Sequence, residues 1–285
     1  MMTRVLILLP VHNRCEITKH FIDSLLSQTY ENYHLILIDD GSTDGTAEMV
    51  GAKVPVDKLT IIKGSGNWWW AGSLQQGINW LRQHDVKSSD VILMINDDVT
   101  FEKEFLEQGV RFIERHQGTL LLARYHDVKT NRIVESGVKA DWSCMSFQEA
   151  TSPEEINCFS TRGLFLSFGA LSKLGNFHPF LLPHYGSDYE YTMRAPKKGL
   201  EMRTIPELYL QANDKTTGIR EGRGRNFLDE WRTMFSKRCA YNPVYWTTFI
   251  LLSCPLRWVA PNLVRVWAGA AKRLGKSFTT WKEIA

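Results

Sequence analysis

The chain has 285 residues, of which 44% are hydrophobic and 23% charged, and its net charge is +3. This length can bury a full core, and the composition is that of a globular protein without low-complexity segments. The five cysteines form no Cys-x-x-Cys pair, which argues against a disulfide framework or a structural zinc site and favours a reducing compartment. The N-terminus leads straight into a strand rather than a signal-peptide core, so we expect a cytosolic protein.

The charge is distributed unevenly along the chain. Residues 220–285 carry 12 Lys/Arg and 4 Asp/Glu, whereas residues 1–219 carry 22 Lys/Arg and 27 Asp/Glu. A basic, aromatic C-terminal region indicates either a surface that meets an anionic partner or a basic solvated surface. We therefore expect a body of residues 1–219 and an extension of residues 220–285.

Apolar runs and helical periodicity alternate through the first half of the chain. Buried strands are predicted at residues 5–11, 35–38, 59–62 and 91–95, with helices at 16–28, after 46, and at 73–83. This rhythm requires right-handed crossovers, so the fold class is α/β, with a mostly parallel central sheet flanked by helices.

The second half of the body is less regular. The sequence predicts a helix at 101–116, strands at 119–123 and 164–168, a hairpin around Thr130-Asn131, a helix near residue 187 and a final strand at 202–209. Pro196 should kink or shorten the helix near residue 187, because proline cannot donate a helical hydrogen bond.

From Arg225 onward the pattern is helical and rich in aromatic residues. The apolar run 244–254 is shorter than the roughly 20 residues that a membrane span requires, so no transmembrane helix is expected. Interleaved Trp, Leu and Arg/Lys residues fit a helix that lies in a membrane interface. A helical hairpin packed on the body explains the same pattern equally well.

Polar clusters follow three of the predicted strands, namely His12-Asn13, Asp39-Asp40 and Asn96-Asp97-Asp98. In an open α/β sheet, ligands bind at the carboxyl ends of the strands. Adjacent carboxylates suit a divalent cation shared with substrate phosphates, although the third cluster alone could also be a solvated turn. A Gly-x-Gly-x-x-Gly motif and a phosphate-loop motif are both absent, which argues against a nicotinamide dinucleotide enzyme and a P-loop kinase.

Three motifs resemble those of the family 2 glycosyltransferases: residues 10–14 (Pro-Val-His-Asn-Arg), 39–46 (Asp-Asp-Gly-Ser-Thr-Asp-Gly-Thr) and 96–99 (Asn-Asp-Asp-Val). These are inverting enzymes of the GT-A fold that use nucleotide sugars. Residues 66–72 (Gly-Asn-Trp-Trp-Trp-Ala-Gly) resemble a variant found in bacterial polysaccharide transferases, including rhamnosyltransferase-like members. The resemblance covers the body and implies a GT-A fold followed by a C-terminal helical extension.

The resemblance implies a donor site at the strand ends. Asp40 would bind the base, Asn96 would lie near the ribose, and Asp98 would hold Mg²⁺ or Mn²⁺ on the diphosphate. The nucleotide-sugar-binding residues that it implies are Pro10, His12, Asn13, Asp40, Gly66, Asn67, Trp70, Asn96 and Asp97. The Trp triplet could stack on a sugar, or one or two of its members could pack in the core.

Asp188, in the segment Ser187-Asp188-Tyr189-Glu190, matches the general base of the family, which takes a proton from the acceptor hydroxyl. Alternatively, Asp188 could be a helix N-cap residue rather than a general base. Ser187 stands where the family has Glu, so Glu190 is a further candidate for part of the acidic role. Asn213 and Asp214 are candidates for a last metal ligand, because the His that many members have there is missing.

The resulting prediction is a metal-dependent inverting glycosyltransferase. It would move a sugar from a UDP- or dTDP-sugar to a hydroxyl of a glycan or lipid-linked acceptor in bacterial surface polysaccharide synthesis. The basic extension would hold it at the inner face of the cell membrane, with no nucleic-acid partner and with homo-oligomers allowed. The alternatives are a sugar nucleotidyltransferase, whose Gly-rich basic signature is missing after the first strand, and a catalytically weak glycan-binding module.

Overall fold

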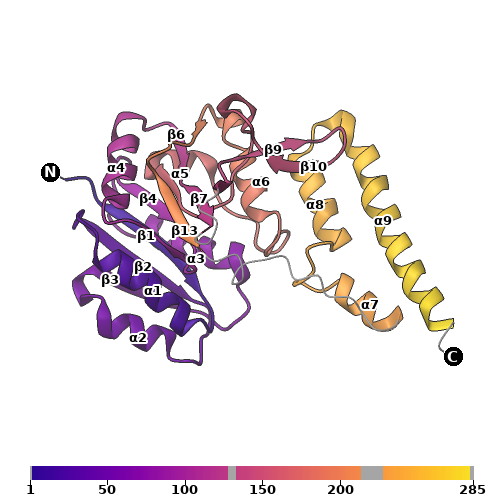
Figure 1. The fold of residues 1–285 in the computed structure, drawn as a ribbon, viewed down its shortest axis with the longest axis horizontal. Coiled ribbons are helices and arrows are strands. Elements are labelled where there is room, and N and C mark those ends of the chain that lie inside the picture. The colour runs from indigo at the N-terminus through magenta and orange to yellow at the C-terminus, as the bar shows by residue number, and fades with distance from the viewer. Residues whose placement is uncertain (1, 128–132, 213–226, 283–285) are drawn as a thin grey trace.

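The computed structural model describes residues 2–127, 133–212 and 227–282. Its centre is a seven-stranded sheet in the order β12-β6-β11-β4-β1-β2-β3, with helices on both faces (Figure 1). Every pair in this sheet is parallel except those of β11, which runs antiparallel to β4 and β6. The expected mostly parallel α/β sheet is confirmed.

The elements of the body have the following bounds. The central strands are β1 (Val5–Val11), β2 (Tyr33–Asp39), β3 (Leu59–Lys63), β4 (Val91–Met94), β6 (Thr119–Leu122), β11 (Leu164–Ser167) and β12 (Glu201–Arg203). The helices are α1 (Cys15–Leu26), α2 (Thr46–Lys53), α3 (Trp69–Gln83), α4 (Phe105–Arg115), α5 (Phe168–Leu174) and α6 (Ser187–Met193). Two smaller sheets contain β5 (Val99–Thr100), β7 (Arg124–Asp127), β8 (Ile133–Glu135) and β13 (Tyr209–Ala212), and β9 (Val138–Asp141) with β10 (Ser146–Glu149).

Strand β1 shows how the sequence builds the two layers of the core. Its residues are all buried, and alternate side chains belong to different hydrophobic clusters, with Ile7 in one and Leu8 in the other. This follows from the two-residue period of a strand that is covered on both faces. Pairing of β1 with β2 sets Val11 beside Asp39, so the polar residues that follow both strands emerge at one edge.

The predicted bounds of three elements are wrong. The single strand expected at 202–209 is two strands, β12 and β13, in different sheets. Pro206 lies between them and cannot donate to a ladder, so the chain changes sheet there. The helix expected at 73–83 begins earlier, at Trp69, and the helix expected at 101–116 begins at Phe105.

Two local predictions are confirmed. Helix α6 ends at Met193, and Pro196 opens a separate 3-10 turn (Pro196–Lys198). Strands β7 and β8 pair antiparallel as the arms of a hairpin, whose predicted tip at Thr130-Asn131 lies outside the described residues.

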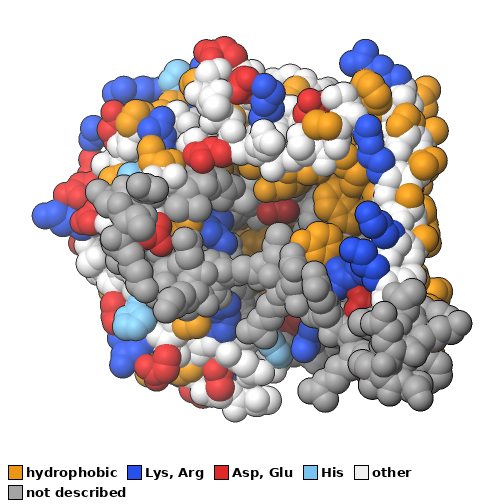
Figure 2. Space-filling view, turned by 45° about the vertical axis from the view of Figure 1, so that its right-hand side comes forward, with side chains coloured by type: hydrophobic (Ala, Val, Ile, Leu, Met, Phe, Trp, Pro, Cys, Tyr) orange, Lys and Arg blue, Asp and Glu red, His pale blue; other side chains and the backbone are white. Residues whose placement is uncertain are grey.

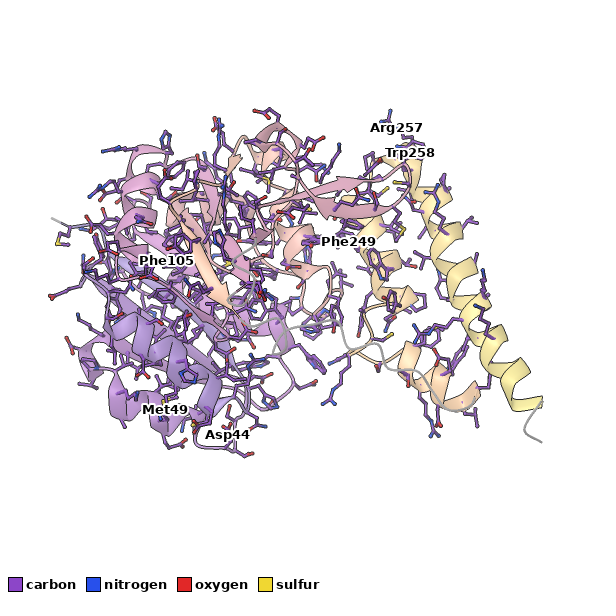
Figure 3. All side chains as sticks on the ribbon, viewed as in Figure 1. Asp44, Met49, Phe105, Phe249, Arg257 and Trp258 are labelled. Carbon is purple, nitrogen blue, oxygen red and sulfur yellow. The ribbon has the colours of Figure 1, made fainter. Side chains whose placement is uncertain are left out.

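The C-terminal region forms α7 (Phe227–Met234), α8 (Pro243–Ser253) and α9 (Leu256–Lys282) beside the body (Figure 1). Helix α8 packs on α6 and on α9, and α9 also packs on α7. Phe249 lies on the side of α8 that faces α6 (Figure 3), where it is buried against Gly186. None of the helices in the described part of the chain is both long and apolar enough to cross a membrane. The expected boundary at residues 219–220 lies in a segment that the structure does not describe.

Candidate active site

The loops that follow β1 and β2 are joined by hydrogen bonds. Asn13 adopts a left-handed backbone (φ +52°), its N–H donates to Ser42 Oγ at 2.9 Å, and its Oδ1 accepts from the Thr43 N–H at 2.8 Å. His12 Nδ1 lies 2.7 Å from the carbonyl oxygen of Asp40. The structure therefore brings the predicted residues His12, Asn13 and Asp40 together at one edge of the sheet.

Asp40 anchors the segment that precedes α3. Its carboxylate is buried and accepts the N–H groups of Gly66 at 2.8 Å and, through Oδ2, of Trp68 at 2.7 Å and Trp69 at 3.1 Å. These bonds satisfy amides at the start of α3, which explains why the helix begins at Trp69 rather than at residue 73.

The Trp triplet divides between the core and the site. Trp68 and Trp70 pack on the core layer that contains Leu8, and Trp70 Nε1 donates to Thr161 Oγ1 at 2.9 Å. Trp69 instead donates its Nε1–H to Asn67 Oδ1 at 3.1 Å. The expectation that one or two members pack in the core is confirmed, and the predicted donor residue Trp70 is one of them.

Trp69 has a left-handed backbone (φ +58°) that bulky side chains rarely adopt. Such a conformation costs on the order of 1–3 kcal/mol and is concentrated at functional sites. The indole ring lies 5.8 Å from the ring of His184, and burial lowers the pKa of that histidine. Sequence reasoning considered the whole Trp triplet but named Trp70 rather than Trp69 among the donor-site residues, because three adjacent Trp residues do not indicate by themselves which of them faces the core.

The acidic residues after β4 are held by Arg14. Its Nε lies 3.0 Å from Asp97 Oδ2 and its Nη2 lies 3.1 Å from Asp98 Oδ2. Asp97 also accepts the hydroxyl of Thr18 at 2.9 Å. Burial raises the pKa of Asp97 to about 6, against the opposing effect of Arg14. Arg14 is therefore a component of the site. Sequence reasoning included it in the motif of residues 10–14 but assigned it no role.

Two side-chain oxygens in the segment that follows β4 have no hydrogen-bond partner among the described residues. They are Asn96 Oδ1 and Asp98 Oδ1, and both are buried. Amide and carboxylate oxygens are the ligands that Mg²⁺ and Mn²⁺ prefer, and Mg²⁺ commonly takes one or two protein ligands with substrate phosphates and water. The chemistry of these two atoms is therefore that of candidate ligands for such an ion. Within the described ranges no group of three His, Cys, Asp or Glu side chains could hold a metal, and Asn213 and Asp214 lie outside them.

Asp188 is the second residue of α6, half-buried, and its Oδ1 accepts the N–H of Tyr189 at 3.0 Å. The N-cap position belongs to Gly186, so the N-cap interpretation of Asp188 is wrong. Glu190 is buried and ion-paired with Arg194, whose Nη1 also donates to the carbonyl oxygen of Asn176 at 2.6 Å. Glu190 thus fixes α6 to the end of α5, and Asp188 is the more accessible acid.

An aromatic cluster with members from three parts of the chain includes Tyr189, next to Asp188. The ring of Phe147, on β10, stacks on Tyr189 at 5.7 Å and lies 5.8 Å from Trp246 and 5.7 Å from Phe249, both on α8. Trp142 contacts Phe249 at 5.3 Å. Hydrophobic side chains also line a hollow between the body and the C-terminal helices (Figure 2). The extension therefore forms part of the surface beside the predicted base.

The sequence model of the Glycosyl transferase family 2 matches residues 6–170, which contain the strand-end clusters described above. The chain belongs to this family. It is 33% identical to EpsE of Bacillus subtilis (strain 168) over 141 residues, 48% of this chain and 46% of EpsE. It is 27% identical to the amylovoran biosynthesis glycosyltransferase AmsB of Erwinia amylovora over 115 residues, 39% of this chain and 36% of AmsB. The chain thus spans less than half the length of these curated relatives.

Solved structures show the same fold. S. aureus TarS 1-349 superposes with a TM-score of 0.61 at 15% identity, covering 100% of this chain and 92% of that one. GalNAc-T7 with UDP, GalNAc and Mn²⁺ gives a TM-score of 0.61 at 12% identity, covering 74% of this chain and 44% of that one. The fold is therefore GT-A, and the family identifies a glycosyltransferase rather than a sugar nucleotidyltransferase.

Proposed function

We propose that this family 2 protein transfers a sugar from a UDP- or dTDP-sugar to a hydroxyl group of a glycan or lipid-linked acceptor, with inversion at the anomeric carbon. The observation that carries the proposal is that Asn96 and Asp98, at a strand end, each have a buried oxygen without a hydrogen-bond partner in the described part of the chain. TarS has been crystallised with UDP-GlcNAc and GalNAc-T7 with UDP and Mn²⁺, which supports a nucleotide sugar and a divalent ion as ligands of this site.

In this proposal each side chain has a defined task. Asp188 accepts the proton of the acceptor hydroxyl while the oxygen attacks the anomeric carbon from the side opposite the diphosphate. The Glu190–Arg194 pair holds α6, and hence Asp188, in place. Asn96 and Asp98 would hold the metal ion, which when bound neutralises charge on the departing diphosphate. Arg14 keeps the two acids together.

Replacement of the base tests this assignment. Asp188→Asn keeps the size of the side chain and its oxygen beside the Tyr189 N–H but cannot take a proton, so transfer should fall about 10²–10⁴-fold. Nucleoside-diphosphate binding, measured calorimetrically, should stay near the wild-type value. Asp57→Asn, at an exposed position outside the site, is the matched control and should leave both quantities unchanged. An active Asp188→Asn enzyme would contradict the proposal.

A role in surface polysaccharide synthesis, of a capsule or a lipopolysaccharide, is supported by the similarity to AmsB, which is named for amylovoran biosynthesis. The aromatic side chains around Tyr189 offer flat apolar faces beside Asp188. Such faces suit the rings of a glycan or the first part of a lipid-linked acceptor.

We also infer that the C-terminal helices contact the cytoplasmic surface of an anionic membrane. Residues 243–282 contain no Asp or Glu, and their cations are Arg257, Arg265, Lys272, Arg273, Lys276 and Lys282. Large apolar side chains on the same helices are exposed, including Leu251 (61%), Leu256 (91%) and Val264 (69%). Exposed apolar side chains among cations favour an interfacial position.

This membrane contact can be tested without disturbing the packing of α8 on the body. The variant Leu251→Glu/Leu256→Glu/Val264→Glu changes only exposed side chains, so it should fold normally yet lose co-sedimentation with vesicles that contain anionic lipid. Val56→Glu, at a body position that is also 91% exposed, should bind as the wild type does. Unchanged binding of the triple variant would overturn the inference.

A further inference from the structure

The turn between α7 and α8 points back toward the body (Figure 1) and is held by hydrogen bonds of its own. Asn242, which is 2% exposed, donates to the Ser236 carbonyl at 3.1 Å and caps α8 by accepting the Val244 N–H at 3.0 Å. Trp246 Nε1 closes the turn by donating to the Ala240 carbonyl oxygen at 2.8 Å. With these bonds made inside the turn, its outward side chains are presented at fixed positions.

Two of those outward side chains are cations that reach the segment anchored by Asp40. Lys237 Nζ donates to Asn67 Oδ1 at 3.0 Å, and the guanidinium of Arg238 lies 6.0 Å from the ring centre of Trp69. Asn67 Oδ1 also accepts the indole N–H of Trp69, so one amide oxygen connects Lys237 with Trp69. Lys237 and Arg238 are both exposed, and neither is ion-paired with a carboxylate of the described residues.

Arg14, the other cation of the site, differs from Lys237 and Arg238 in having carboxylate partners. Arg14 is already ion-paired with Asp97 and Asp98, so its charge is compensated within the protein. Arg14 therefore offers an anion a compensated charge, whereas Lys237 and Arg238 offer uncompensated charge beside Asn67 and Trp69. The strained backbone of Trp69 keeps its indole ring beside Arg238 and its N–H on Asn67.

We propose that Lys237 and Arg238 bind the diphosphate of the sugar donor, so that the C-terminal extension completes the donor site. This inference rests on the proposed function and assigns it two binding residues outside the family-matched segment, residues 6–170. Lys237 and Arg238 would form charge-assisted hydrogen bonds with phosphate oxygens as the nucleotide enters beside Asn67. Trp69 and Asn67 act as positioning residues for the two cations.

The test compares ligands that differ only in phosphate. Binding of uridine, UMP and UDP, and of thymidine, dTMP and dTDP, is measured by calorimetry with the full chain, with Mg²⁺ and with EDTA. The Lys237→Ala/Arg238→Ala variant should weaken binding of the preferred diphosphate about tenfold or more, while the matching nucleoside changes less than twofold. The slope of affinity against salt concentration should also fall, because two cations no longer meet the phosphates.

Matched variants separate charge from structure. Arg238→Lys keeps the charge and should retain most of the diphosphate affinity, and Lys198→Ala, at an exposed position in the turn after α6, should leave the diphosphate affinity unchanged. Lys237→Gln/Arg238→Gln, which keeps long polar side chains, repeats the measurement if the alanine variant has a lowered melting temperature. Diphosphate affinity within twofold of wild type, or an equal loss for the nucleoside, overturns the inference. Failure of the wild-type protein to bind either diphosphate would instead overturn the proposed donor.

Discussion

Asp40 follows β2 and Asp98 follows β4, the two strands on either side of β1. Both residues are buried, with exposed fractions of 6% and 9%, but their hydrogen bonding is opposite. Asp40 accepts three backbone N–H groups, whereas one oxygen of Asp98 has no partner in the described part of the chain. An unpaired buried polar atom costs free energy, so it persists where a ligand supplies the partner. Of these two acids, Asp40 builds the site and Asp98 is the one left for a ligand.

The largest expected effect on stability comes from removing Arg14, the cation that compensates the charges of Asp97 and Asp98. Arg14→Met leaves Asp97 and Asp98 buried together without a positive charge, and the free energy of unfolding in urea should fall by about 3–5 kcal/mol. Added Mg²⁺ should recover part of this loss, since it would replace the missing charge. The control is Arg111→Met, which breaks an exposed pair with Glu107 and should cost less than about 0.5 kcal/mol. Equal losses in the two variants would show that Arg14 compensates no buried charge.

A smaller loss is expected at Asp40. Asp40→Asn replaces one acceptor oxygen by an NH₂ group that faces backbone N–H groups, so the free energy of unfolding should fall by about 2 kcal/mol. Nucleotide affinity should fall as well, because the segment 66–69 loses its anchor. If Asp40 served only to contact the base, affinity would fall with stability unchanged, and urea unfolding distinguishes these results.

The smallest effect on stability is expected at Asp98. Asp98→Asn preserves the shape and leaves Arg14 paired with Asp97, so the free energy of unfolding should change by less than about 1 kcal/mol. The additional rise in melting temperature that Mn²⁺ produces in the presence of UDP or dTDP should disappear, because a bound ligand stabilises the native state. A Mn²⁺-dependent rise that survives in Asp98→Asn would remove Asp98 from the candidate metal ligands.

The central strands and the polar strand ends could be predicted because both follow from local patterns. Five consecutive apolar residues, Val91 to Ile95, indicate a strand covered on both faces, and the acids directly after it must emerge at the ligand-binding edge. The direction of β11 could not be predicted, since its three apolar residues, Leu164 to Leu166, give the same pattern in a parallel or an antiparallel pair.

The arrangement of the site was less predictable because it depends on contacts between distant segments. Nothing near Arg14 in the sequence indicates that it lies between Asp97 and Asp98. The same holds for Lys237, which approaches Asn67 only because α8 packs on α6. The motif predicted that Asp40 is important, but its three amide partners follow from the course of the loop at 64–69.

The left-handed backbone of Trp69 has a consequence for any attempt to improve this protein. Glycine adopts φ +58° without a steric penalty, so position 69 is one where relief of strain and retention of the indole ring exclude each other. Selection for heat resistance alone would favour glycine there, and selection for turnover would restore tryptophan. If variants at position 69 are selected in parallel for heat resistance and for turnover, glycine should therefore be enriched in the first pool and tryptophan in the second.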